Sequence, residues 1–211
     1  MITNAPPPRG AGRPRTFDDD AIFAATARAL IRLGYTRLTL AAVAEELGSS
    51  PPALSKRFRS KRRLLLEFGE WSVRATEERF QQVRRAHASP LEALQAHLLP
   101  TETRTDEADD AEGFSRHLAF YLETARDPEF RELWDRRFQI GEEQIVLSLD
   151  QARAHGELAA CCDVPRLSRT LQAALTGAAL LATIDPRQSM RERLLEVFES
   201  VVGPHRTRAR D

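Results

Sequence analysis

Two short amphipathic segments meet at Gly48 and set a strong limit on the folds open to this chain. Thr39 is a good N-cap residue for the first segment, and Gly48 is a typical C-terminal stop. Between them, apolar residues follow the i, i+3, i+4, i+7 spacing of a helix with one buried face. These residues are Leu40, Val43, Ala44 and Leu47.

The second segment begins at Ser49 or Ser50, and either serine would cap a helix well. Pro51 stands where a first-turn proline is tolerated. Leu54 and Phe58, four residues apart, give this helix one buried face. Two short helices joined by a tight turn form a helix-turn-helix, so the sequence predicts that unit here.

The charge of the chain is unevenly distributed. The formal net charge is zero, but residues 1–70 carry 12 Lys and Arg against 7 Asp and Glu, whereas residues 71–211 carry 19 against 24. Six of the eight residues from Lys56 to Arg63 are basic. Such a run can simply be a solvated face, but beside a capped helix pair it favours a DNA-reading helix flanked by phosphate-neutralising cations.

The rest of the chain is also expected to be helical, because apolar residues recur at helical spacing and period-two strand patterns are nearly absent. A first helix is expected from near Thr16 or Asp18 to Gly34, and Ser60 is expected to cap a longer one. Segment 102–112, with six acids and one arginine, is expected to be an exposed loop. The later helices are expected at Pro90–Leu99, Gly113–Ala125, Pro128–His155, Pro165–Ile184 and Met190–Val202.

The segment Ala21–Glu70 resembles the DNA-binding domain of TetR-family transcriptional regulators. The matching marks are Gly34-Tyr35, Thr39, Val43-Ala44, Leu47-Gly48, Ser50, Leu54, Phe58 and Ser60-Lys61 followed by Leu64-Leu65. The resemblance implies an all-α fold with a three-helix DNA-binding domain at residues 17–64. A helical ligand-binding and dimerisation domain would occupy residues 65–211, after a flexible basic arm at residues 1–16.

The resemblance also implies a role for particular residues on DNA. Ser55 stands where the family usually has tyrosine, and Pro52 where it favours a small residue such as glycine, so the usual contacts with DNA are altered. Proline also lacks the backbone N–H that could bind a phosphate. The candidate DNA-binding residues are Arg13 and Arg15 of the arm, then Thr39, Ser50, Ser55, Lys56, Arg57 and Lys61. Lys61 resembles the family's phosphate-contacting lysine; the alternative is an ordinary surface lysine. Arginines of the arm suit a narrow minor groove, but the arm can equally be a disordered tail with incidental arginines.

A cluster of aromatic residues at near-helical spacing suggests an effector pocket in the C-terminal domain. Aromatic stripes of this kind are usually plain core. An effector pocket would add a few polar groups to apolar walls, here His117 and Tyr121. The candidate pocket residues are Phe114, His117, Phe120, Tyr121, Trp134 and Phe138.

Two apolar stripes near the C-terminus suggest a dimer interface. Each stripe could also face the protein's own core, but the family resemblance implies that both helices pair with their symmetry mates in a four-helix bundle. The candidate interface residues are Leu171, Leu175, Ala178, Leu194, Phe198 and Val201.

Several other classes of protein are disfavoured. The longest stretch without a charge, Thr170–Ile184, has fifteen residues, too few for a membrane span. We find no enzyme signature, no metal-ligand spacing and no cofactor motif, and we read the adjacent Cys161 and Cys162 as reduced thiols or a redox switch. The sequence therefore predicts a cytoplasmic, homodimeric, ligand-released repressor of a palindromic operator. The alternative is an architectural DNA-binding protein or an activator without a small-molecule effector.

Overall fold

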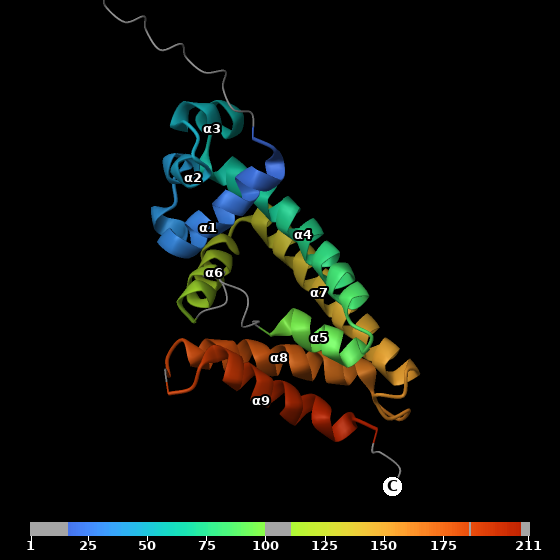
Figure 1. The fold of residues 1–211 in the computed structure, drawn as a ribbon. Coiled ribbons are helices and arrows are strands. Elements are labelled where there is room, and N and C mark those ends of the chain that lie inside the picture. Colours follow the sequence, from blue (N-terminus) through green and yellow to red (C-terminus); the bar gives the residue numbers. More distant parts are fainter. Residues whose placement is uncertain (1–16, 100–110, 186, 208–211) are drawn as a thin grey trace, which may run out of the picture.

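The computed structural model describes residues 17–99, 111–185 and 187–207. Within these ranges the chain is built of α-helices with no sheet, which confirms the all-α prediction (Figure 1). The helices are α1 (Asp19–Arg37), α2 (Leu40–Leu47), α3 (Pro51–Phe58), α4 (Lys61–Ala86), α5 (Pro90–Leu98), α6 (Ala111–Thr124), α7 (Pro128–Ala154), α8 (Val164–Ala182) and α9 (Met190–Val202).

Local capping chemistry explains where the first helices begin. The side chain of Asp18 accepts a hydrogen bond from the Ala21 N–H at 2.8 Å and caps α1. Ser60 caps α4 in the same way, through the Arg63 N–H at 3.1 Å. The expected stop at Gly34 is a kink rather than an end: Gly34 has φ 73°, and a further helical turn follows it to Arg37.

The helices α4 and α7 lie side by side and connect the two ends of the molecule (Figure 1). The side chain of Leu133 in α7 packs against the α4 backbone at Gly69, where a Cβ atom would lie 2.8 Å from Cδ1 of Leu133. Helix α4 runs without a break through the expected boundary between residues 64 and 65, so the two predicted domains share one continuous helix.

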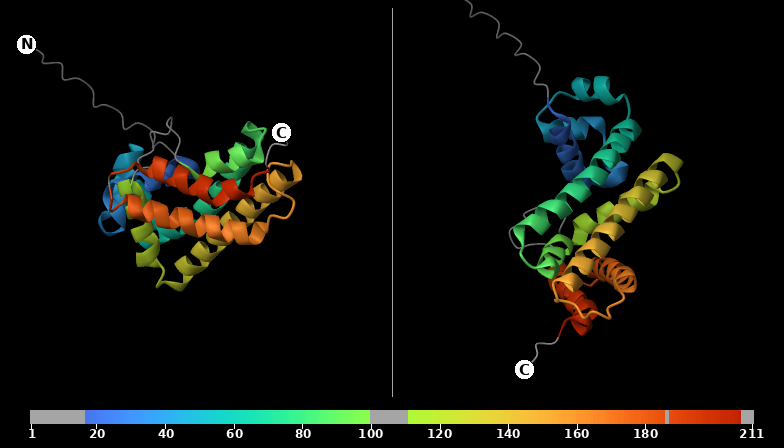
Figure 2. Two further views of the ribbon diagram at one scale, coloured as in Figure 1. Left: turned by 90° about the horizontal axis from the view of Figure 1, so that it is seen from below. Right: turned by 90° about the vertical axis from the view of Figure 1, so that its right-hand side faces the viewer.

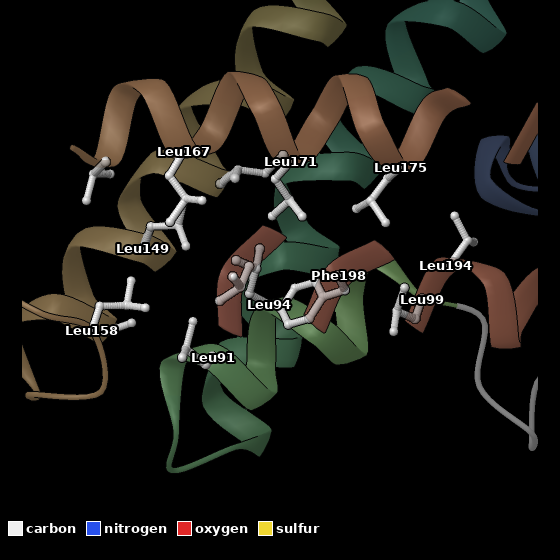
Figure 3. Close-up of a cluster of buried hydrophobic side chains, with 14 of the residues drawn as sticks. Leu91, Leu94, Leu99, Leu149, Leu158, Leu167, Leu171, Leu175, Leu194 and Phe198 are labelled. Atoms are coloured by element: carbon white, nitrogen blue, oxygen red, sulfur yellow. The ribbon is translucent and has the colours of Figure 1, made fainter. Parts of the chain in front are cut away.

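Two hydrophobic cores hold the molecule together. The first lies among α1 to α4 and also takes in Phe120 of α6 and Phe130, Leu133 and Trp134 of α7. The second core joins α4, α5, α7, α8 and α9 (Figure 3). Because α6 and α7 contribute to the first core, a shift of either helix changes the packing against α1 and α4.

The short helices α2 and α3 lie at one end of the molecule, and α8 and α9 pack together at the other (Figures 1 and 2). No helix in the described part of the chain is long and apolar enough to cross a membrane.

Candidate functional site

The helix pair α2 and α3 forms the predicted helix-turn-helix. Thr39 accepts a hydrogen bond from the Ala42 N–H at 3.1 Å, which confirms its capping role. Gly48 then ends α2 in the left-handed conformation, with φ 66° and ψ 31°. Ser50 occupies the N-cap position of α3, but its side chain makes no capping hydrogen bond. The buried residues Val43, Ala44, Leu54 and Phe58 fix the two helices against α1 and α4.

The outer face of α3 presents polar and basic side chains to solvent. Ser55, Lys56 and Arg57 are all exposed, with Lys56 opposite the buried pair Leu54 and Phe58 and the other two at the edges of the exposed face. This is the arrangement that a recognition helix needs, because one face must pack while the other enters the major groove.

Most of the basic side chains between Lys56 and Arg63 make contacts within the protein. Arg57 pairs with Asp19 of α1, and Arg63 pairs with Glu67 at 2.7 Å. Arg62 binds Asp127 at 2.8 Å and also Glu129 at the start of α7. These carboxylates raise the pKa of the Arg62 guanidinium. Of this run, only Lys56 and Arg59 lack an ion pair or an internal hydrogen bond from their side chains within the described residues.

Lys61 is also turned inward. Its ammonium group donates a hydrogen bond to the carbonyl oxygen of Tyr35 and lies 4.1 Å from the centre of the Tyr35 ring. Burial lowers the pKa of this lysine. In this arrangement the Lys61 side chain holds α4 to α1, so a contact with phosphate would require it to leave Tyr35. Arg13 and Arg15 lie outside the described residues.

The six predicted effector-pocket residues divide into two groups. Phe120 and Trp134 are buried in the core that α6 and α7 share with α1 to α4, which revises their assignment to a pocket wall. The rings of Tyr121 and Trp134 meet edge to face, with centroids 4.5 Å apart. Tyr121 belongs with Phe120 and Trp134, because it packs, partly buried, against the same core. The remaining three, Phe114, His117 and Phe138, line cavities.

Two adjoining cavities lie beside α4. The first, which we call the α1 cavity, has a volume of about 690 Å³ and is walled by α1, α4, α6 and α7, with His117 in its lining. The second, the α8 cavity, has about 340 Å³ and lies among α4 to α9, with Phe114 and Phe138 in its lining. The two cavities share four lining residues: Thr76, Arg79, His97 and Arg137.

The groups around Arg137 are unusual for a protein interior. Nε of Arg137 and Nδ1 of His97 are buried without a hydrogen-bond partner among the described residues. His117 Nε2 lies 2.8 Å from the hydroxyl of Tyr121, and the Arg137 guanidinium lies 5.6 Å from the centre of the Tyr121 ring. Burial first, and the nearby charge of Arg137 second, lower the pKa of His117 to about 4. Sequence analysis missed Arg79, His97 and Arg137, because nothing in the spacing of single residues on α4, α5 and α7 shows that they converge.

The predicted dimer residues face inward. Leu171 and Phe198 are fully buried within one subunit, and Leu175 and Leu194 pack beside them (Figure 3). Ala178 is buried and Val201 partly buried against the same core. These side chains therefore pack in the core of the chain itself. The opposite, outer face of α8 exposes Ala173, Gly177, Leu180 and Leu181, and Ile184 is exposed just beyond the end of the helix.

The described residues hold no group of three or more metal-ligating side chains placed to bind an ion.

The N-terminal helices match the family model of the bacterial regulatory proteins of the tetR family over residues 22–68. Residues 90–203, which are more than half of the chain, match the C-terminal domain of the BetI-type transcriptional repressors. The chain therefore belongs to the TetR family of DNA-binding transcriptional regulators.

Solved structures show the same fold. A regulator from Saccharomonospora viridis in complex with choline is 20% identical, with 90% of this chain and 97% of that chain covered and a TM-score of 0.72. A TetR regulator from Haloarcula marismortui is 19% identical, with 89% and 97% covered and a TM-score of 0.68. SmeT, the repressor of a Stenotrophomonas maltophilia multidrug efflux pump, is 16% identical, with 89% and 90% covered and a TM-score of 0.58. No curated protein sequence matches this chain.

Proposed function

We propose that this regulator is a cytoplasmic homodimeric repressor that binds a palindromic DNA operator and leaves it when a small molecule occupies the cavities beside α4. The observation that carries the proposal is the exposed face of α3. It presents Ser55 and Lys56, with Arg57 paired to Asp19 at its edge, on a helix whose other face is buried against α1 and α4.

The proposed dimer has a physical reason. One short recognition helix contacts few base pairs, whereas a twofold pair doubles the site and fixes the spacing of its half-sites. The apolar outer face of α8 lies at the end of the molecule away from α3, so subunits joined there leave both recognition helices free (Figure 1).

The position of the cavities supports the ligand response. Helix α6 carries His117, which lines the α1 cavity, and the neighbouring Arg116 donates hydrogen bonds to the carbonyls of Ile31 and Arg32 in α1 at 2.6 and 2.5 Å. A ligand that displaces α6 therefore acts on α1, which packs against α2. By linkage, a ligand that weakens operator binding must itself be bound more weakly by the operator complex, by the same factor.

Gel-shift titrations at two salt concentrations, with random duplex as competitor, test the proposal. We expect preferential binding to one selected duplex and a steep loss of affinity as salt rises, because phosphate contacts release counterions. Equal and weak binding to every duplex would contradict a specific repressor and would support the architectural alternative.

A further inference from the structure

Among the residues that the structure describes, those that line the cavities beside α4 carry more positive than negative charge. No acidic residue of the described ranges lines the α8 cavity. Glu46 is the one described carboxylate that lines the α1 cavity, and it is already bound by Arg28 at 3.0 Å and Arg32 at 3.2 Å. Arg79 and Arg137 line both cavities, and neither forms an ion pair with a carboxylate of the described residues.

Arg79 and Arg137 are partly buried, and charge that leaves water is stabilised by pairing with an opposite charge. The Nε atom of Arg137 is buried and makes no hydrogen bond within the described residues. The Nδ1 atom of His97, another buried group that lines both cavities, has no partner there either. These groups are thus available to a ligand placed where the two cavities meet.

The two histidines beside Arg137 add no positive charge to the site at pH 7. The pKa of His97 is lowered to about 4 by burial and by the charges of Arg84 and Arg137, and that of His117 is lowered to about 4 by burial and Arg137. Both imidazoles are therefore neutral at pH 7 and can offer hydrogen bonds beside the guanidinium.

Most of the other residues that line the α8 cavity are apolar. They include Phe80, Leu98, Phe114, Phe138 and Leu194. A molecule that satisfies the whole site therefore needs an anionic end and an apolar body.

From these observations we infer that the effector is an amphipathic carboxylate, whose anionic group binds Arg137 and Arg79 where the two cavities meet and whose apolar body lies in the α8 cavity. Planar guanidinium groups recognise carboxylates with two parallel hydrogen bonds. A quaternary ammonium such as choline, bound by the Saccharomonospora viridis neighbour, is disfavoured by the charge of this site. This inference rests on the proposed ligand response, since it names the class of ligand for the same cavities.

Calorimetric titration of the full-length protein with 4-phenylbutyrate, 4-phenylbutanol, 4-phenylbutylamine and choline tests the inference. The first three share an apolar body and differ in charge. We expect the carboxylate to bind at least tenfold more tightly than the alcohol, and the two cations to bind more weakly than the alcohol. Tighter binding of either cation, or binding of none of the four, would overturn the inference.

The substitution Arg137→Gln tests the site itself. It should reduce carboxylate affinity to about that of the alcohol and leave alcohol affinity unchanged, whereas Arg74→Gln, at an exposed position on α4, should change neither. Alcohol binding by Arg137→Gln shows that the variant is folded, and unchanged carboxylate binding in that folded variant would overturn the inference. Operator binding measured on the same preparations separates the two claims: if the operator is bound and no carboxylate is, the inference fails while the DNA-binding proposal stands.

Discussion

Lys56 is the residue of α3 whose charge is most available to DNA. It is exposed, whereas the neighbouring Arg57 is held by Asp19 and lies with its guanidinium carbon 4.9 Å from the centre of the Phe58 ring. The basic run therefore supplies fewer free cations than its composition suggests, because an ion pair within the protein competes with one to phosphate.

Lys56→Ala should weaken binding to operator and random duplex alike, by roughly fivefold or about 1 kcal/mol, and should lower the salt slope by about 1. The physical reason is that a phosphate contact carries no base information. Ser55→Ala should instead change the preference among operator variants and leave the slope unchanged. Gel shifts at several salt concentrations measure both, with Arg74→Ala as the control. An unchanged slope for Lys56→Ala would contradict this assignment.

The two histidines near Arg137 make stability depend on pH. Their folded pKa values of about 4 lie below the ordinary value of 6.5. The unfolded chain therefore binds more protons than the folded one as pH falls, and the free energy of unfolding must decrease between about pH 6.5 and pH 4. Each histidine should contribute about 1 to 3 kcal/mol to this decrease.

Urea unfolding at pH 7 and pH 4.5 measures the effect. His117→Gln should show a smaller loss of stability than the parent protein, because the glutamine does not titrate while its other neighbours, Arg137 and Tyr121, are retained. His155→Gln, at an exposed position, should match the parent. The assignment fails if the two variants lose equal stability.

At the scale of helices, Arg116 of α6 caps the part of α1 that precedes the kink at Gly34. The kink at Gly34 interrupts the helical hydrogen bonds, and carbonyls just before it need other donors. Arg116 supplies them to Ile31 and Arg32. This contact joins α6, which lines the α1 cavity, to α1, which packs against α2 of the helix-turn-helix.

Arg116→Ala should lower the free energy of unfolding by about 1 to 2 kcal/mol, because hydrogen bonds to charged groups are worth that order of energy. It should also reduce the effect of ligand on operator affinity, since one link between α6 and α1 is lost. Urea titration and gel shifts with and without ligand measure the two effects. Arg126→Ala, at an exposed position just beyond α6, is the control. A stable variant with full ligand response would contradict this role.

The helices were predictable from sequence because their ends depend on local chemistry. The caps at Thr39 and Ser60 and the left-handed Gly48 are encoded within three or four residues of each helix end. The lining of the two cavities was only partly predictable, because Arg79, His97 and Arg137 come from helices far apart in sequence. The aromatic spacing could not distinguish a core residue such as Trp134 from a cavity residue such as Phe138, since both follow the same helical period.

At the scale of the whole molecule, the outer face of α8 is the surface that we expect to form the dimer. Leu181 is 53% exposed and Ile184 is 73% exposed, although both are apolar. Side chains of this kind gathered on one face are typical of an interaction site. The sequence predicted an interface on the sides of α8 and α9 that pack in the protein's own core, because small and apolar residues occur on both sides of α8 and their spacing alone does not show which side faces outward.

Leu181→Glu combined with Ile184→Glu should yield a folded monomer near 23.8 kDa, against about twice that mass for the parent protein. Charges placed in an apolar interface lose water without gaining a partner. Leu122→Glu changes an exposed leucine of α6 and should remain dimeric. Light scattering at micromolar concentration measures the masses. A parent protein that is monomeric, or a double variant that stays dimeric, would contradict the interface.

The central claim is that two copies of α3 read one symmetric operator. The most direct measurement is selection of bound duplexes from a random DNA pool, followed by footprinting of the selected sequence with the full-length protein. We expect two inverted half-sites separated by about one helical turn or more, protected together as protein is added. Protection of a single half-site, or gradual coating without a preferred sequence, would contradict the claim.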